Sequence, residues 1–313
     1  MTTSDTCRPR PNPQMKKGSQ KKVINKTVFC LILLMGSVAL AQSPQTANVG
    51  PEKGWLILHG GGIDTKREYG HYHRFAELAG GVNASVVVIL TPVDLDVLTP
   101  AFLTQYKQWW KSELGLADVS FMDTRNRQEA ETEAFVAPLR KATGVWIMGG
   151  HLTNLLNVYL GTRTEREIKA VAERGGVVAG TSAGAMIQGS FLVNLTKTPS
   201  DLRLSRSGMF LDPARMVGFG LLRGVAVYPH FFARHAEKDL LEVVARYPEL
   251  LGVGIDEGAA IVVHNDQFEV ISGRVGIFER ARKKHLTLSK GQKFDLRRRV
   301  VIEWLTFLRI QCF

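Results

Sequence analysis

Between residues 55 and 251 the chain alternates short, uninterrupted apolar runs with longer amphipathic stretches. Apolar runs without a period of two predict strands that are buried on both faces, as in a parallel sheet covered by helices. Strands are expected at 55–58, 85–90, 119–122, 144–148, 177–179 and 225–227, and helices at 67–79, 98–114, 129–141 and 164–173. The alternation predicts an α/β fold with a doubly wound, mostly parallel sheet and helices on both faces.

The pattern changes after residue 251, where the apolar runs become shorter and follow one another closely. Strands are expected at 253–255, 259–263, 268–271 and 275–278, as a C-terminal antiparallel extension of the same domain. Residues 54–299 are therefore expected to form one domain. A polar linker, residues 42–53, precedes it, and an apolar tail, residues 300–313, follows it with no assigned role.

The amino terminus has the three parts of a secretory signal peptide. A basic stretch comes first, then an apolar core at 28–35, and then Ala39-Leu40-Ala41, which has the small-x-small pattern of a cleavage site. Residues 1–41 are therefore assigned to a cleaved signal, with Met15 as an alternative start. The apolar core is too short to span a bilayer. We expect a secreted or periplasmic protein, attached to a membrane only if the signal is not cleaved.

The net charge of +11 is concentrated at the two ends of the chain. Excess basic side chains lie within the expected signal and between residues 274 and 299. Because no groove-entering motif or aromatic interleaving accompanies the C-terminal group, it predicts a solvated face and no nucleic acid partner. Of the three cysteines only Cys312 lies beyond the signal, so no internal disulfide is expected in the mature chain.

A candidate nucleophile lies in the segment Gly180-Thr181-Ser182-Ala183-Gly184, which has the G-x-S-x-G pattern. An apolar strand precedes the segment and a small-residue helix follows it, which is the context that this pattern requires. The tight turn exposes the Ser182 hydroxyl at the carboxyl end of the sheet, and the N–H of Ala183 lies where an oxyanion would develop. The alternative is an ordinary capping serine in a glycine-rich turn.

A serine hydroxyl needs a general base, usually a histidine held by a carboxylate. His230 follows the strand at 225–227, and Asp256-Glu257 follow the strand at 253–255, so these side chains are expected at the same rim of the sheet as Ser182. From their context alone, His230 and Glu257 are as well explained as hydrogen-bonded loop residues.

Two motifs, taken in order, resemble a known family. The segments 175–185, around Ser182, and 252–260, which contains Gly-Ile-Asp-Glu, are similar to those of the cyanophycinase and aspartyl-dipeptidase family of serine peptidases. The likeness extends over about residues 55–300, including the Gly149-Gly150 turn and the His-Phe-x-x-Arg segment at residue 230.

This resemblance implies a fold related to class I glutamine amidotransferases and a Ser–His–Glu triad. Ser182 would be the nucleophile, His230 the general base and then acid, and Glu257 the residue that orients the imidazole. The backbone N–H groups of Ala183 and of Gly150 or His151 would hold the oxyanion, and Arg234 would bind substrate. The resemblance also implies an aspartyl or isopeptide-linked peptide substrate, a homodimer, and catalysis without metal or organic cofactor.

The chain departs from the family pattern at positions that determine substrate specificity. His151-Leu152 follow the Gly-Gly turn where an acidic, amide or basic residue and then glutamine are common, and Tyr228-Pro229 replace an acid and a glutamine before the histidine. Ala236 and Asp239 stand where further arginines would be expected. The catalytic positions are retained, while the natural substrate, cyanophycin included, stays open.

Two other functions remain open on these residues. The altered specificity positions allow a catalytically silent binding protein on the same fold. His59-Gly60-Gly61-Gly62 resembles the oxyanion loop of one class of esterases, although those need Ser, Asp and His in that order with the acid far downstream, and Asp212 follows Ser182 closely. His71 and His73 have no third ligand at a recognisable spacing, so we expect surface histidines and no metal site there.

Overall fold

The fold is described from a computed structural model, which describes residues 47–62, 69–193, 217–282 and 284–302. All of them belong to one compact unit, Thr46–Phe313. The expected signal, residues 42–46 of the linker and residues 303–313 of the tail lie outside the described residues. Within the described part of the chain, no helix is both long enough and apolar enough to cross a membrane.

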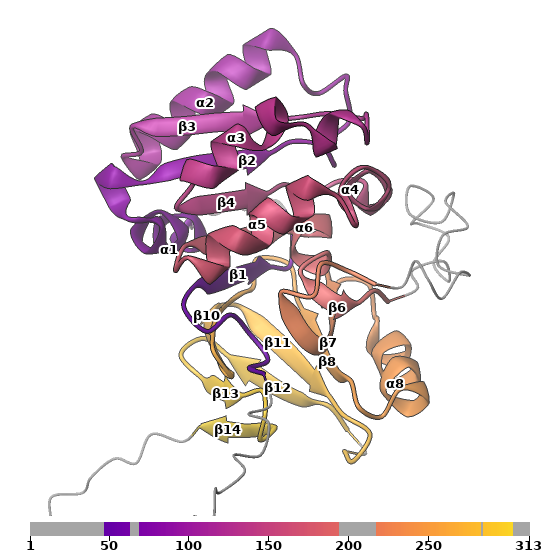
Figure 1. Cartoon of the computed structure of the whole chain (residues 1–313). Helices are drawn as coiled ribbons and strands as arrows, with labels where there is room; N and C mark the ends of the chain where they lie inside the picture. Colours follow the sequence, from indigo (N-terminus) through magenta and orange to yellow (C-terminus); the bar gives the residue numbers. More distant parts are fainter. Residues whose placement is uncertain (1–46, 63–68, 194–216, 283, 303–313) are drawn as a thin grey trace, which may run out of the picture. The chain divides into compact units, whose positions relative to one another are not determined.

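A nine-stranded sheet in the described part of the chain has the order β14-β13-β10-β9-β1-β5-β4-β2-β3, and its five parallel strands form one side of it, from β1 to the edge strand β3 (Figure 1). The parallel strands are β1 (Trp55–His59), β2 (Ser85–Ile89), β3 (Asp118–Met122), β4 (Gly144–Ile147) and β5 (Val177–Thr181). Each of them coincides with a strand that the apolar runs predict, which confirms the α/β fold class.

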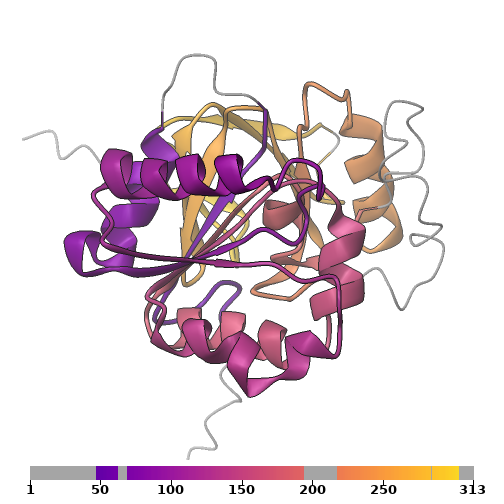
Figure 2. The ribbon, with the colours of Figure 1, turned by 90° about the horizontal axis from the view of Figure 1, so that it is seen from above.

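Helices cover both faces of these strands, as Figure 2 shows from above. Alternate residues of one strand enter different cores: Val86 and Val88 pack with α1 (Gly70–Ala79) and α2 (Pro100–Leu114), while Val87 and Ile89 face α3 (Glu133–Lys141) and α5 (Arg163–Glu173). A strand buried on both faces needs apolar residues at every position, which explains the uninterrupted runs.

Threonine side chains fix the start of two of these helices. The Thr99 hydroxyl accepts the Phe102 N–H at 3.2 Å ahead of α2, and the Thr132 hydroxyl accepts the Phe135 N–H at 3.3 Å ahead of α3. Such caps satisfy donors that have no partner inside the helix. The caps place both helix starts later than the sequence pattern predicts.

Two of the four strands expected in the antiparallel extension, 259–263 and 268–271, lie in an antiparallel group beside β1. It consists of β9 (Ala260–His264), β10 (Gln267–Ser272), β13 (Lys293–Asp295) and β14 (Val300–Ile302). Residues 300–302, which were placed in the tail, are therefore an edge strand of the sheet. The end of the linker also packs on this region, since the Val49 N–H donates to Asp266 Oδ1 at 2.7 Å.

A second, five-stranded sheet has the order β12-β11-β8-β7-β6 in the described part of the chain. Its strands are β6 (Gly189–Phe191), β7 (Leu222–Pro229), β8 (Leu251–Ile255), β11 (Arg274–Phe278) and β12 (Leu286–Ser289), and α8 (Glu237–Arg246) packs on β8 and β11. The expectation that 253–255 and 275–278 join the same antiparallel extension as 259–263 and 268–271 is wrong: β8 and β11 pair antiparallel with each other in this second sheet, and β8 also pairs in parallel with β7. This second sheet carries part of the site.

Candidate active site

Ser182 lies in a strained turn between β5 and α6 (Ala183–Met186). Its backbone has φ 50° and ψ −114°, a conformation that non-glycine residues rarely adopt. The turn is tight enough that a Cβ on Gly184 would lie 2.1 Å from the Ile147 carbonyl oxygen. These features are those of a nucleophile elbow, which the G-x-S-x-G pattern predicts.

The His230 imidazole lies directly against this serine. Its Nε2 is 2.8 Å from Ser182 Oγ, a hydrogen-bond distance suited to proton transfer. His230 follows the end of β7 and also has a positive φ, of 55°. Its own N–H donates to the Gly60 carbonyl at 2.8 Å, which fixes the backbone that presents the ring.

Glu257 completes the contact chain on the far side of the imidazole. Its Oε1 lies 2.7 Å from His230 Nδ1, and 49% of its side chain is exposed, against 14% for His230. The neighbouring Asp256 has a different task. Its Oδ1 accepts the N–H groups of Phe232 and Ala233 at 3.1 and 3.2 Å, so it holds the turn that follows His230.

The three predicted side chains therefore meet, but not at the rim of one sheet. Ser182 follows β5 of the nine-stranded sheet, whereas His230 and Glu257 follow β7 and β8 of the second sheet. The single-rim expectation is wrong, because β7 and β8 both belong to the second sheet, where they pair with each other and not with the parallel strands around β5. The site lies where the carboxyl ends of the two sheets come together.

The segment Gly60-Gly61-Gly62 fills the space between these elements. A Cβ on Gly61 would lie 2.4 Å from His230 Cε1, and one on Gly62 would lie 2.8 Å from Glu257 Cβ. The Gly61 carbonyl accepts the Gly258 N–H at 2.9 Å. Only a chain without side chains can pass so close to both residues, so the glycines form a spacer under the imidazole and the carboxylate.

The esterase interpretation of this segment is disfavoured by the same contacts. An oxyanion loop needs backbone N–H groups that point at the substrate. Here the Gly60 N–H donates to the Ala259 carbonyl at 2.9 Å, and the Gly61 N–H donates to His59 Nδ1 at 3.3 Å. Both donors are engaged within the protein.

Of the predicted oxyanion donors, Ala183 and Gly150 keep that assignment as a prediction and His151 does not. Ala183 is the first residue of α6, so its N–H has no acceptor within the helix. The Gly149-Gly150 turn passes beside the serine, since a Cβ on Gly149 would lie 3.1 Å from Ser182 Cβ. The His151 N–H instead donates to the Pro92 carbonyl at 2.7 Å, which corrects the choice between Gly150 and His151.

Two of the departures from the family pattern contact each other. The Tyr228 hydroxyl donates to Asp239 Oδ2 at 3.1 Å, and the Tyr228 side chain is fully buried. Arg234, the predicted substrate-binding residue, is half-buried, and its backbone N–H donates to the His230 backbone carbonyl at 3.0 Å. Its role toward a substrate stays a prediction.

A hollow of about 490 Å³ opens beside the Gly150 turn. It is lined by Val93, Asp94, Leu95, Asp96, Arg125, His151 and Asn154. His151 Nε2 lies 2.6 Å from Asp94 Oδ1, so the departure at position 151 forms an ion pair or hydrogen bond at this wall.

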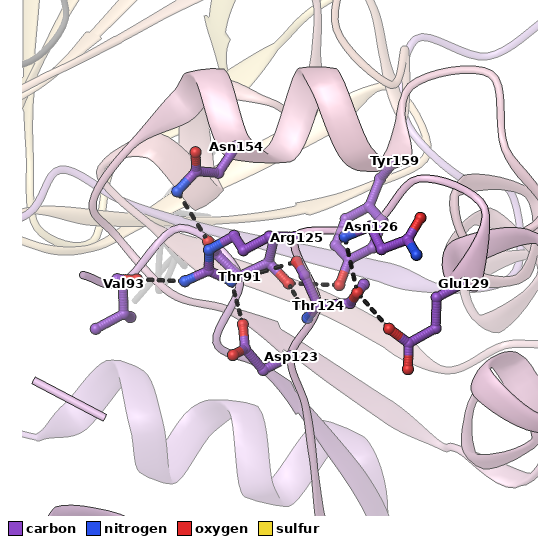
Figure 3. A network of polar contacts seen from close by, with 9 residues as sticks. All are labelled: Thr91, Val93, Asp123, Thr124, Arg125, Asn126, Glu129, Asn154 and Tyr159. Atoms are coloured by element: carbon purple, nitrogen blue, oxygen red, sulfur yellow. Dashed lines mark hydrogen bonds and ion pairs between the residues drawn. The ribbon is translucent and has the colours of Figure 1, made fainter. Parts of the chain in front are cut away.

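A polar network fixes the loop on one side of this hollow (Figure 3). Arg125 donates to the Val93 carbonyl at 2.6 Å and pairs with Asp123, and Asn154 donates to the Thr91 carbonyl at 3.3 Å. The Thr91 hydroxyl meets the Tyr159 hydroxyl at 2.5 Å, and burial raises the pKa of Tyr159 far above its ordinary value. The wall is therefore held in place by charged and neutral hydrogen bonds.

Behind the serine, two buried histidines stack on each other. The rings of His59 and His71 lie 4.0 Å apart with an angle of 12° between their planes, and both side chains are almost fully buried. The prediction of two surface histidines is thus wrong for His71 and right for His73, which is exposed. In α1 the residues His71, Phe75 and Ala79 recur every four positions on the buried face, a signal present in the sequence.

Burial gives His71 a measurable effect on stability. Burial, aided by the neighbouring His59 ring, lowers the pKa of His71 to about 3 from an ordinary value of 6.5. Between these values the unfolded chain binds a proton that the folded protein does not, so stability falls as the pH is lowered below 6.5. We expect this residue to cost about 2 kcal/mol of unfolding free energy between pH 7 and pH 5.

Urea unfolding of the protein and of His71→Phe at several pH values checks this expectation. The ring of phenylalanine keeps the stacking and does not titrate, so the variant should lose less stability on acidification. Equal losses in the two proteins would assign the acid sensitivity to other groups.

Among the described residues, no group of three or more His, Cys, Asp or Glu side chains is arranged to hold a metal ion. The pairs nearest the site, His59 with His71 and His230 with Glu257, are instead engaged with each other.

Most of the domain is similar in sequence to proteins of one peptidase family. The sequence profile of peptidase family S51 matches residues 56–271. A cyanophycinase of Geminocystis herdmanii is 26% identical over 221 residues, which cover 70% of this chain and 77% of that protein. A cyanophycinase of a Nostoc species is 34% identical over 167 residues, which cover 52% of this chain and 53% of that protein. The chain thus matches about half the length of the Nostoc relative.

A solved structure, the crystal structure of a peptidase from an acI-B1 actinobacterium, has a similar fold. The TM-score is 0.61 at 23% sequence identity, over 79% of this chain and 98% of that one. At this identity the likeness concerns the fold alone, which is the class I glutamine amidotransferase-like fold that the resemblance implies.

Proposed function

Because the chain belongs to peptidase family S51 and is a serine-type peptidase, we propose that it hydrolyses an amide bond through an acyl-enzyme on Ser182. The observation that carries this proposal is the unbroken series of contacts from Ser182 Oγ through His230 to Glu257, at 2.8 and 2.7 Å. Nucleophile, base and orienting carboxylate have the order and geometry that acyl transfer requires.

In the first half of the reaction, Ser182 Oγ attacks the scissile carbonyl carbon while His230 Nε2 takes the hydroxyl proton. Glu257 keeps the Nδ1 proton of the ring pointing toward itself and stabilises the imidazolium that forms. The N–H groups of Ala183 and Gly150 are proposed to hold the oxyanion. The imidazolium then gives its proton to the leaving amine, and the acyl-enzyme remains.

In the second half, water replaces the amine. His230 removes a proton from the water as it attacks the ester carbonyl, and returns that proton to Ser182 Oγ when the acyl group leaves. No step requires a metal ion or an organic cofactor, in keeping with the chemistry of the three side chains.

The proposed substrate is a short peptide with an aspartyl or isopeptide-linked amide bond, as the resemblance to cyanophycinases and aspartyl dipeptidases implies. Cyanophycin itself is less well supported, because Tyr228 is buried and bonded to Asp239 instead of facing the site, and His151 is paired with Asp94. The signal-like amino terminus supports the further proposal that the reaction takes place outside the cytoplasm.

Labelling by a fluorophosphonate probe tests the function. We expect the folded protein to react covalently at Ser182, and Ser182→Ala to abolish labelling without changing the melting temperature by more than a few degrees, since its side chain loses only one hydroxyl. A folded protein that does not label, or that labels equally in Ser182→Ala, would be a binding protein on this fold or use another nucleophile.

Substrate classes are separated by comparing β-aspartyl dipeptides, α-linked aspartyl dipeptides and short-chain aryl esters. The proposal expects the highest kcat/KM on an aspartyl peptide. A preference for esters that survives Glu257→Gln would favour the esterase alternative.

A further inference from the structure

His59 is the one residue of the segment 59–62 that has a side chain, and the mechanism above does not use it. Its imidazole is 4% exposed, at the end of β1 and behind Ser182. An imidazole placed in an apolar core loses its hydration, which is costly unless its polar atoms are engaged. An apolar side chain of similar size would fill the same space, so the contacts that the ring makes have to explain it.

Two of these contacts are made by the same ring atom. The Gly61 N–H donates to His59 Nδ1 at 3.3 Å, so Nδ1 carries a lone pair, and the Thr181 hydroxyl, 2.9 Å from Nδ1, must also be a donor to it. The imidazole thereby ties the glycine spacer to the last residue of β5.

Both tied residues lie next to reacting groups. Thr181 directly precedes Ser182, and the Ser182 N–H donates to the backbone carbonyl of His59 at 3.0 Å. Gly61 packs under the His230 ring so closely that a Cβ on it would lie 2.5 Å from Nε2, the atom that faces Ser182 Oγ. A shift of Gly61 or Thr181 would therefore change the distance between the serine and its base.

The stacked His71 ring keeps the His59 ring from turning. The two rings are nearly parallel, and His71 is itself held in α1 against Tyr72, at a centroid distance of 4.5 Å. The stacking fixes the plane of the His59 ring, and the Gly61 N–H and the Thr181 hydroxyl favour the flip in which Nδ1 faces them.

We propose that His59 is a positioning residue that holds Gly61 and Thr181 together and so sets the Ser182–His230 distance for proton transfer. It touches neither substrate nor reacting atoms and acts through the glycine spacer and the strand end. This inference rests on the proposed function, in which His230 is the base for Ser182.

Four variants separate positioning from packing. His59→Leu keeps the volume and removes the acceptor, while His59→Asn places its Oδ1 near the position of Nδ1 and restores an acceptor. His71→Phe removes the other imidazole of the same buried stack and serves as the matched control. Thr181→Val, which removes one donor to Nδ1, carries the test if His59→Leu does not fold.

The expected result is a loss in kcat of about 10- to 100-fold for His59→Leu, with KM within twofold, because misplacement near the chemistry slows the step rather than weakens binding. His59→Asn should regain at least tenfold of a 100-fold loss, and His71→Phe should stay within threefold of the unchanged protein. Melting temperatures of all variants are measured alongside.

A second measurement does not depend on turnover. The proton between His230 Nδ1 and Glu257 Oε1 should give a low-field proton NMR signal, identified by its upfield shift in Glu257→Gln, whose neutral amide oxygen is a weaker acceptor. His59→Leu or Thr181→Val should shift or broaden this signal, and His59→Asn and His71→Phe should leave it in place.

Equal loss of kcat in His59→Leu, His59→Asn and His71→Phe, or an unshifted signal in His59→Leu and Thr181→Val, would overturn the positioning role. Failure of the proposed function looks different: the unchanged protein would then neither label at Ser182 nor turn over peptides. In that case the NMR comparison of His59→Leu with His59→Asn still decides whether His59 positions the imidazole.

Discussion

Replacing His230 by asparagine is expected to lower kcat by roughly 10⁵- to 10⁶-fold. The imidazole is the only side chain with a hydrogen-bond contact to Ser182 Oγ among the described residues, at 2.8 Å, so no other described side chain is placed to take its proton. Removing the base of a serine hydrolase costs about as much as removing the nucleophile, because the members of a triad act as a unit.

Asparagine is chosen because the backbone at this position has a φ of 55°. Asparagine tolerates this left-handed region better than alanine, so the change removes the imidazole with little added strain. The shorter amide cannot act as a base at neutral pH. Steady-state hydrolysis of an aspartyl peptide and the rate of fluorophosphonate labelling measure the effect.

His235→Asn provides the matched control. His235 lies in the same turn, also has a positive φ, of 50°, and is exposed. Its replacement should leave kcat within about twofold. If His230→Asn retained more than a hundredth of the activity, or if both variants lost activity equally, a different base would have to serve Ser182.

The sequence alone predicts the part of the site that is local. Ser182 can be identified because strand, turn and helix follow one another within about a dozen residues. Glycine is needed in this turn because a Cβ on Gly184 would lie 2.1 Å from the Ile147 carbonyl oxygen. The five parallel strands can be predicted for a similar reason, because a strand buried on both faces has an uninterrupted apolar sequence whatever its neighbours are.

The convergence of the triad from two sheets could not be predicted in this way. Whether a strand such as β8 lies beside β7 or, like β9, beside β1 depends on contacts between distant segments, and the apolar runs at 253–255 and 259–263 look alike. His230 and Glu257 do meet Ser182, as the sequence predicts, but from the second sheet and not from the sheet that carries Ser182, and their catalytic roles stay a prediction.

The engaged N–H of His151 and the glycine spacer show a related limit. A backbone donor is recognised only when its acceptor is known, and the Pro92 carbonyl that accepts from His151 lies on the loop after β2. The segment Gly60-Gly61-Gly62 has the composition of an oxyanion loop, yet its contacts with His230 and Glu257 give it another task. The composition of this segment marks it as unusual, but only its contacts in the folded protein indicate that it packs under His230 and Glu257.

Replacing Glu257 by glutamine is expected to lower kcat by roughly 10²- to 10³-fold with little change in KM. Where the triad carboxylate is buried, its amide costs about 10⁴-fold. Here 49% of the side chain is exposed, so water screens the charge, and the amide can rotate to present its oxygen to His230 Nδ1. The loss should therefore reflect weaker stabilisation of the imidazolium and only in part a misplaced ring.

Asp256→Asn removes the same charge from the adjacent residue and isolates the effect of contact with the imidazole. The asparagine oxygen can still accept the N–H groups of Phe232 and Ala233, which Asp256 Oδ1 holds at 3.1 and 3.2 Å, and only the pairing with Arg274 at 3.3 Å is weakened. We expect kcat to stay within threefold and the melting temperature to fall slightly. If the two variants lost the same activity, the negative potential of this edge would matter more than the bond at 2.7 Å between Glu257 and His230. A large loss confined to Glu257→Gln would assign the effect to that bond, because the two substitutions change the net charge equally and differ in whether the carboxylate touches the base.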